Sequence, residues 1–184
     1  VRVLGPESEA AAPDGELGEL CFRGPSVIRG YYQAPEVNET AFTSDGFLRS
    51  GDLGRRRVIE GRAVYTVEGR LKDQISRGGE KFMAGELETL LAQHPDVREV
   101  VAVGMPDERL GERVAVFVVP RTTGLDAEEL RRRFVDHLDQ LQVAKFKWPE
   151  RVEIIDEIPK TGIGKPLKHV LRDRLVSSTS DSKE

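Results

Sequence analysis

Residues 69–82 read Gly69-Arg70-Leu71-Lys72-Asp73-Gln74-Ile75-Ser76-Arg77-Gly78-Gly79-Glu80-Lys81-Phe82. This stretch combines turn glycines, charged side chains and an adjacent glycine pair, a combination that few ordinary structural segments need. Adjacent glycines lose much backbone entropy on folding, so they mark a positive φ or a place where a ligand or another segment approaches the main chain closely. A tight hairpin turn explains the pair as well, and both interpretations can hold at once.

A second glycine-rich segment, Pro-Lys-Thr-Gly-Ile-Gly-Lys, occupies residues 159–165. It is not a phosphate-binding P-loop, because Pro159 and Pro166 stand where that motif needs glycine and a hydroxyl residue. The loop could instead carry the ammonium of Lys165 against a phosphate or carboxylate, where it would stabilise developing negative charge. The alternative is a solvated lysine that begins a helix. Together with residues 69–82, the segment suggests adenylate chemistry.

The overall composition is that of a globular protein. Of the 184 residues, 38% are hydrophobic, which is compatible with a packed core. The 28 basic and 32 acidic residues give a net charge of −4, so no broad positive field favours nucleic acid or anionic lipid as a partner. The single cysteine, Cys21, cannot form an internal disulfide, and no apolar run has the roughly 18 residues of a membrane span. A reducing cytoplasm is the simplest compartment.

The chain begins with Val-Arg-Val, without an initiator methionine and without the charged and apolar leader of a secreted protein. Because it begins inside a strand-like alternation, we expect a piece of a larger protein rather than a mature chain that has lost a leader. The function must then be judged for a longer parent protein.

Residues 1–72 are dense in turn formers, and short strands fit between them. The candidate strands are residues 19–23, 47–49 and 63–67. The last of these alternates apolar and polar positions next to a Glu-Gly turn signal. This part of the chain is therefore predicted to be β-rich.

From residue 84 onward the hydrophobic period changes to that of a helix. Leu87, Leu90 and Leu91 place an apolar stripe on a helix over residues 84–93. Runs rich in β-branched residues then predict strands that are buried on at least one face. These strands lie at residues 97–103, 113–119 and 151–155.

Two more helices are predicted in the last third of the chain. Asp126 has the features of an N-cap, with Glu129 as its capping-box partner, and an apolar stripe continues to Leu141. A short helix over residues 167–175 precedes a segment that is too polar to pack. The order α-β-β-α-β-α predicts a compact α+β domain with helices against a small sheet.

Two polar residues near the middle of the chain are candidates for nucleotide binding. Asp52 follows Gly51, where its carboxylate could accept two hydrogen bonds from a ribose diol. An ordinary turn is the alternative. Arg70 follows Gly69 just after a predicted strand, where its planar guanidinium could hold a ribose or phosphate oxygen. A surface ion pair is the alternative for this arginine.

The histidines do not indicate a metal site or a hydrolase. His94, His137 and His169 lack the spacing of metal ligands, and one cysteine cannot complete a zinc set. No Ser-His-Asp order supports hydrolase chemistry. We interpret the three histidines as structural.

Four motifs, taken in order, resemble the C-terminal third of the adenylate-forming superfamily: acyl-CoA synthetases, luciferases and the adenylation enzymes of nonribosomal peptide synthesis. They lie at residues 18–24 with 30–32, 50–53, 69–73 and 159–165. The match covers nearly the whole chain. The resemblance implies that Asp52 holds the ribose hydroxyls of ATP, that Arg70 contacts the ribose or phosphate region, and that Lys165 bridges the acid carboxylate and the α-phosphate during adenylation.

The resemblance also implies motion. Asp73 would be the hinge about which the small C-terminal domain rotates, withdrawing Lys165 after the adenylate forms and presenting the face of Gly78 and Gly79 for thiol attack. The implied domains are the β-rich end of a large N-terminal adenylation domain at 1–72, a mobile lid carrying the catalytic lysine at 73–176, and a disordered tail at 177–184.

Residues 72–81, KDQISRGGEK, are most similar to stand-alone aryl-acid AMP ligases, which load 2,3-dihydroxybenzoate or salicylate onto an aryl carrier protein. The resemblance implies an ATP- and Mg²⁺-dependent ligase of siderophore or nonribosomal peptide biosynthesis, with carrier phosphopantetheine as the thiol. Pro166 departs from the usual Ile or Val after the lysine. The phosphate loop, adenine site and acid pocket would precede Val1, so this chain alone should be inactive.

Two alternatives to that function stay open. An acyl-CoA synthetase would use free coenzyme A as the acceptor. A non-catalytic module would only dock a carrier protein, and Arg77 and Arg113 would then form a basic face for an acidic carrier helix.

Overall fold

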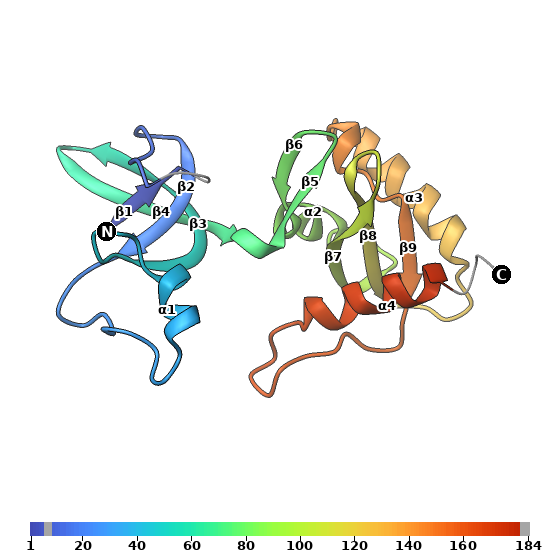
Figure 1. Cartoon of the computed structure of the whole chain (residues 1–184). Helices are drawn as coiled ribbons and strands as arrows, with labels where there is room; N and C mark the ends of the chain where they lie inside the picture. Colours follow the sequence, from blue (N-terminus) through green and yellow to red (C-terminus); the bar gives the residue numbers. More distant parts are fainter. Residues whose placement is uncertain (6–8, 181–184) are drawn as a thin grey trace. The chain divides into compact units, whose positions relative to one another are not determined.

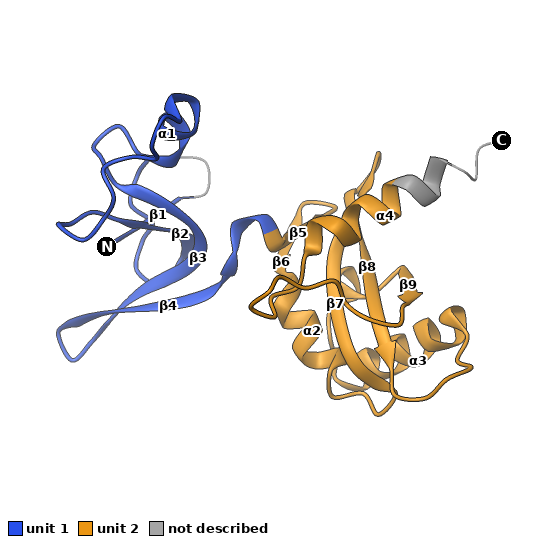
Figure 2. Cartoon of the chain, turned by 90° about the horizontal axis from the view of Figure 1, so that it is seen from below, with its two compact units in different colours: residues 1–72 blue, residues 73–184 orange. Residues whose placement is uncertain are grey.

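The computed structural model describes residues 1–5 and 9–180, with side chains up to residue 176 (Figure 1). The chain divides into two compact units, Val1–Lys72 and Asp73–Glu184, which are coloured separately in Figure 2. Each unit has its own sheet, and the described residues form four α-helices. The predicted α+β class is confirmed.

Unit 1 is an antiparallel sheet with the strand order β1-β2-β3-β4. Its strands are β1 (Arg2–Leu4), β2 (Leu17–Phe22), β3 (Leu48–Ile59) and β4 (Arg62–Arg70). The sequence predicted parts of the last three strands, but it missed most of β3. Two glycines and three consecutive arginines hide this long strand, because its stability comes from pairing with β2 on one side and β4 on the other.

Unit 1 also contains a short helix, α1 (Pro35–Ala41), that the sequence analysis did not predict. Pro35 stands in its first turn, where the fixed φ of proline suits a helix start. No residue of α1 is buried, so the apolar stripe that reveals most helices is missing. The small core lies in the sheet region around Leu4, Cys21 and Phe47. Burial raises the pKa of the Cys21 thiol to about 11.

Unit 2 is a five-stranded sheet in which β8 is the central strand. The strands are β5 (Gln74–Arg77), β6 (Glu80–Met83), β7 (Val97–Asp107), β8 (Gly111–Pro120) and β9 (Arg151–Ile154). All pairs are antiparallel except β8 with β9, which are parallel. The three strands predicted in this part of the chain are confirmed, and β5 and β6 are additional.

Three helices cover this sheet: α2 (Ala84–Leu91), α3 (Ala127–Gln140) and α4 (Lys168–Ser180). Asp126 caps α3 as predicted, because its carboxylate accepts the backbone N–H groups of Glu128 and Glu129. The Glu129 carboxylate accepts a hydrogen bond from Arg133, one turn further along. The expected disordered tail, residues 177–184, is helical through Ser180, and residues 181–184 lie outside the described part.

The core of unit 2 occupies both faces of its sheet. Successive residues of β8 alternate between two apolar clusters, as the pleat of a strand requires. One cluster joins Val114, Val116 and Val118 to side chains of α2 and α3, including Leu87, Leu91, Leu130, Phe134 and Leu138. The other joins Ala115, Phe117 and Val119 to Leu171 and Leu175 of α4. Helices α2 and α3 therefore cover one face and α4 the other.

The histidines all lie in unit 2. His94 is buried, and its ring packs edge-on against Phe134 and His137, with centroid distances of 5.2 and 5.3 Å. Burial lowers the pKa of His94, although the nearby Asp96 opposes that shift. In the described residues, no group of three or more His, Cys, Asp and Glu residues could hold a metal ion.

Across residues 1–5 and 9–180, no helix combines the length and the apolar character needed to cross a membrane.

Candidate active-site residues

Asp52 and Arg70 face each other across the pair β3 and β4. The strand register places them directly opposite, and Arg70 Nε lies 3.4 Å from Asp52 Oδ1. About half of the Arg70 side chain and a third of the Asp52 side chain are exposed. The surface ion pair that was the alternative for Arg70 is thus present, and both groups keep free edges toward solvent.

The backbone before Asp52 is held by polar side chains of unit 1. Gly51 has a φ of 72°, which favours glycine, and its N–H donates to Glu19 Oε1 at 3.0 Å. The hydroxyl of Ser50 accepts the N–H of Asp52 at 3.0 Å and donates to the carbonyl of Leu20 at 2.6 Å. These bonds fix the direction in which the Asp52 carboxylate leaves the strand.

Glu19 is the buried residue of this arrangement. Its side chain is only 8% exposed, and Oε2 accepts a hydrogen bond from Arg49 at 2.9 Å. A carboxylate at this depth needs such charged and backbone donors. Glu19 falls within the motif at residues 18–24, but no sequence pattern indicates its role, because that role depends on its burial.

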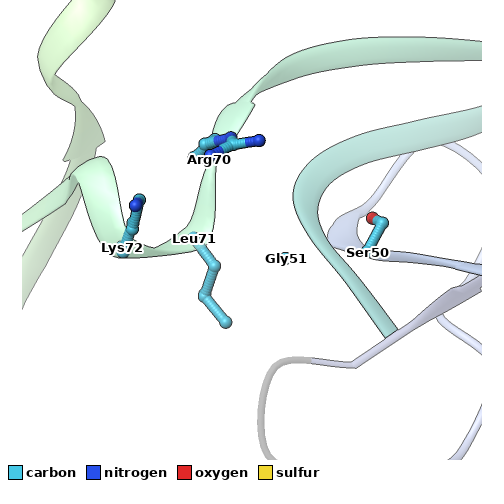
Figure 3. Close-up of a pocket in the computed structure, with 5 residues that line it drawn as sticks. All are labelled: Ser50, Gly51, Arg70, Leu71 and Lys72. Carbon is cyan, nitrogen blue, oxygen red and sulfur yellow. The ribbon is translucent and has the colours of Figure 1, made fainter. Parts of the chain in front are cut away.

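Arg70 borders an open pocket of about 500 Å³ (Figure 3). It is lined by Ser50, Gly51, Arg70, Leu71 and Lys72. Two cationic side chains and a glycine backbone suit an anionic ligand that must approach the main chain closely. Asp52 does not line this pocket, but its carboxylate adjoins it through the contact with Arg70. The residues present therefore fit the ribose and phosphate part of a nucleotide.

Lys165 lies in a tight loop of unit 2. A bridge between Lys160 and Pro166 closes the loop, and Leu167 N–H donates to the carbonyl of Pro159 at 2.8 Å. Inside it, Thr161 N–H donates to the carbonyl of Lys165 at 2.8 Å, and the Thr161 hydroxyl accepts the N–H of Lys165 at 3.1 Å. The backbone at Lys165 is thereby fixed, while its side chain is exposed.

The three lysines of this region differ in their partners. Lys160 forms an ion pair with Glu99 of β7, and Lys168 Nζ lies 2.8 Å from Glu88 Oε1 of α2. Within the described part of the chain, Lys165 has no ion-pair partner. Its ammonium is the cation of this loop that remains available to a ligand.

Gly78 and Gly79 form the two-residue turn between β5 and β6. Their φ values are 61° and 89°, the left-handed pair that a tight hairpin needs. Gly78 N–H donates to the carbonyl of Leu110 at 2.8 Å. A side chain at Gly79 would meet nothing within 4 Å, so its main chain is open to an approaching group. The hairpin interpretation is confirmed.

Asp73 ends the 3₁₀ turn Leu71–Asp73, and the boundary between the two units falls between Lys72 and Asp73. Its Oδ1 atom is buried and has no hydrogen-bond partner in the structure. Arg172 Nη2 lies 3.6 Å from it, within the range of an ion pair.

Arg77 and Arg113 are both engaged within unit 2. Arg77 Nη2 donates to Glu150 Oε1 at 2.9 Å, and only a fifth of its side chain is exposed. Arg113 Nε donates to Asp107 Oδ2 at 2.5 Å. Docking a carrier through these arginines would require a partner that competes with these carboxylates.

Two findings from known proteins bear on these residues. Residues 86–165, which end at Lys165, match the family described as AMP-binding enzyme C-terminal domain. The chain is also 48% identical over 176 residues to the pyochelin synthase PchD of Pseudomonas aeruginosa, covering 95% of this chain and 30% of that protein.

The chain carries an AMP-binding enzyme C-terminal domain. Outside this domain, the similarity extends through unit 1. The 2,3-dihydroxybenzoate-AMP ligase of Bacillus subtilis is 46% identical over 161 residues, which is 88% of this chain and 29% of that enzyme. The crystal structure of ATP-bound MatB from Rhodopseudomonas palustris has a TM-score of 0.80 and 33% identity, over 94% of this chain and 33% of MatB.

The chain thus spans about 30% of the length of the curated relatives it matches. Within the AMP-binding enzyme C-terminal domain lie Glu88 and Glu99, whose ion pairs flank Lys165. Neither glutamate is predicted from the sequence. Isolated glutamates on a helix and a strand give no local signal, because their partners lie about 60 to 80 residues away in the sequence.

Proposed function

We propose that this chain is the C-terminal portion of an ATP-dependent ligase. The enzyme converts an aryl acid into its acyl adenylate and then transfers the acyl group to a thiol. The observation that carries this proposal is the exposed, unpaired ammonium of Lys165 between two lysines that are both paired with glutamates. Such a cation is suited to the place where negative charge concentrates in a transition state.

The proposed reaction consists of two half-reactions. In the first, a carboxylate oxygen of the acid attacks the α-phosphorus of ATP, and pyrophosphate leaves. In the second, a thiol sulfur attacks the acyl carbonyl carbon, the thiol proton is lost, and AMP leaves. Lys165 would act in the first step by bridging the attacking carboxylate and the α-phosphate oxygens. An ammonium in this place stabilises the charge that accumulates between two anions.

Asp52 and Arg70 would hold the nucleotide in both half-reactions. The two oxygens of the Asp52 carboxylate can accept hydrogen bonds from both ribose hydroxyls. Arg70 orients that carboxylate from the opposite strand and presents its remaining N–H groups toward the pocket. Because AMP is part of the adenylate, these contacts would persist after pyrophosphate has left.

The boundary before Asp73 supports the proposed hinge. Rotation there would withdraw Lys165 after adenylation and bring the hairpin of Gly78 and Gly79 to the thiol. The open main chain at Gly79 supports this role, since a slender pantetheine arm needs close approach to a backbone.

The relatives suggest the finer identity of the reactants. The name 2,3-dihydroxybenzoate-AMP ligase favours an aryl acid, and PchD is named for the siderophore pyochelin. We therefore propose a carrier-bound phosphopantetheine as the acceptor, a role in siderophore or nonribosomal peptide synthesis, and a cytoplasmic reaction. Mg²⁺ would accompany ATP and be held mostly by residues of the parent enzyme outside this chain.

The test is acid-dependent exchange of pyrophosphate into ATP by the enzyme that contains this chain. 2,3-Dihydroxybenzoate and salicylate should support exchange, whereas a short aliphatic acid should not. Transfer is then followed by mass spectrometry with a carrier protein or with coenzyme A as the acceptor. No exchange with any aromatic acid would refute the proposal, and transfer to coenzyme A alone would reassign the acceptor.

A further inference from the structure

The loop that carries Lys165 is fastened to unit 2 on both sides. Its incoming stem contains Lys160, whose ammonium pairs with Glu99 of β7. Its outgoing end leads into α4, where Lys168 pairs with Glu88 of α2. The two anchoring glutamates belong to different elements, so the loop is attached at two separate points of the core.

The anchor at Glu88 is the stronger of the two. The Glu88 side chain is 22% exposed and the Lys168 side chain only 14%. Glu88 Oε1 also accepts the backbone N–H of Ala102 at 2.8 Å. This hydrogen bond from β7 holds the carboxylate in the position where it contacts Lys168. A hydrogen bond to a charged group at a partly buried position contributes more to stability than an exposed ion pair does.

The anchor at Glu99 is more exposed, with 36% of the Glu99 side chain and 38% of the Lys160 side chain accessible. Exposed ion pairs contribute little stability on their own. Lys160 is nevertheless one of the two bridge residues that close the loop, and it precedes Thr161, which binds the backbone of Lys165. It therefore restricts the direction in which the loop leaves the sheet.

We propose that Glu88 and Glu99 are positioning residues for Lys165. Each neutralises a neighbouring lysine that would otherwise compete for the same anionic substrate, and each fixes one stem of the loop. Of the three lysines in this region, only Lys165 then presents an unpaired ammonium in the described structure. The positioning of the loop is a property of this chain, whereas its effect on adenylation rests on the function proposed above.

Amide hydrogen exchange on the full chain tests the positioning directly. The reporters are the N–H groups of Gly164, Lys165 and Leu167, which are all hydrogen-bonded within the loop. Glu88→Gln keeps an acceptor for the Ala102 N–H and removes the charge. We expect exchange about tenfold faster for Glu88→Gln and about threefold faster for Glu99→Gln. Unchanged exchange in both variants would overturn the proposal.

Glu128→Gln is the matched control, because it breaks an ion pair with Arg131 on the surface of α3. It should leave exchange in the loop unchanged. Amides of β8, and those of β7 apart from Ala102, should be unchanged in every variant, which shows that the fold is intact. The charge swap Glu99→Lys with Lys160→Glu should restore slow exchange, and failure of the swap would argue against an ion-pair anchor.

The rates of the two half-reactions in the parent enzyme distinguish a role in positioning Lys165 from a general contribution to the stability of the fold. Glu88→Gln should slow adenylation about tenfold and leave transfer from supplied acyl adenylate unchanged. Equal loss of both steps would overturn the positioning role. If the parent shows no adenylation at all while the loop exchange responds as expected, the proposed function fails and the anchoring of the loop stands.

Discussion

Asp52 and Arg70 lie on paired strands and contact each other, whereas Lys165 lies in a loop and has no ion-pair partner in the described structure. The strand pair is held by backbone register and by the polar bonds around Ser50 and Gly51. The loop is held by its own hydrogen bonds and by ion pairs at its two stems, all within unit 2. Residues that keep one ligand through two steps can be rigid, but a residue used in one step must be able to leave. Asp52 and Arg70 belong to unit 1 and Lys165 to unit 2, so the boundary between the units separates the residues proposed for both steps from the residue proposed for one.

Apart from the loss of Lys165 itself, the largest effect among the tests of this comparison is expected at Asp52. Asp52→Asn keeps the shape of the side chain and removes its charge. The KM for ATP should rise about tenfold to a hundredfold, as expected for the loss of hydrogen bonds to a charged group. Because the adenylate is held through the same ribose, transfer from supplied acyl adenylate should weaken as well.

Asp14→Asn is the control for this change, since Asp14 also pairs with an arginine of unit 1, at an exposed position. It should leave both half-reactions unchanged. If Asp52→Asn impaired adenylation alone, Asp52 and Lys165 would act in the same step, and the contrast between the two regions would be lost.

Both regions depend on a glycine with a positive φ, which allows a second test. Gly51 has a φ of 72° and Gly164 a φ of 81°, and a side chain at either position would meet nothing within 4 Å. Alanine should therefore cost about 1–2 kcal/mol through backbone strain alone. Denaturant unfolding should show this loss for Gly51→Ala, whereas Gly164→Ala should mainly speed amide exchange in its own loop.

At Gly85, substitution by alanine should increase stability instead of lowering it. It lies in the first turn of α2 with free space around it and without a positive φ. Gly85→Ala should stabilise the chain by about 0.5–1 kcal/mol, because alanine loses less entropy in a helix. If Gly85→Ala lost as much stability as Gly51→Ala, the cost at Gly51 could not be assigned to its positive φ.

The smallest expected effect is on the pH dependence of stability, which should differ between the two units. Burial lowers the pKa of His94 below its ordinary value of 6.5, so the unfolded chain takes up this proton first as the pH falls. The stability of unit 2 should therefore be complete above about pH 6.5 and decrease as the pH falls below it. Unit 1 contains no histidine and should not share this response.

Thermal unfolding between pH 7.5 and 5.5 measures the effect. His94→Gln should flatten the pH dependence, although its stability at neutral pH will be lower because the ring contacts are lost. The control His169→Gln alters an exposed histidine of α4 and should leave the profile unchanged. A profile unaffected by His94→Gln would contradict the assignment.

Local patterns predicted the elements that carry an apolar stripe or a cap. The helix with Leu87 and Leu91, the capped helix after Asp126 and the glycine-pair hairpin are of this kind. The full length of β3 and the parallel pairing of β9 depend on contacts between distant segments. No window of sequence contains those contacts, so they could not be predicted from it.

The candidate site divides in the same way. Asp52, Arg70 and Lys165 stand in recognisable motifs, and the structure shows the first two in contact. The residues that support them, Glu19 and Glu88, could not be found from the sequence. Their roles come from burial and from partners on other elements.

The central claim is that Lys165 serves adenylation and not transfer, and the two half-reactions of Lys165→Ala in the parent enzyme test it most directly. Pyrophosphate exchange should fall about a hundredfold to a thousandfold, as when one preorganised electrostatic group is removed from an active site. Transfer from supplied acyl adenylate should match the wild type, and Arg174→Ala, which removes an exposed cation of α4, should change neither step. An equal loss of both steps in Lys165→Ala, or full exchange without the lysine, would contradict the account.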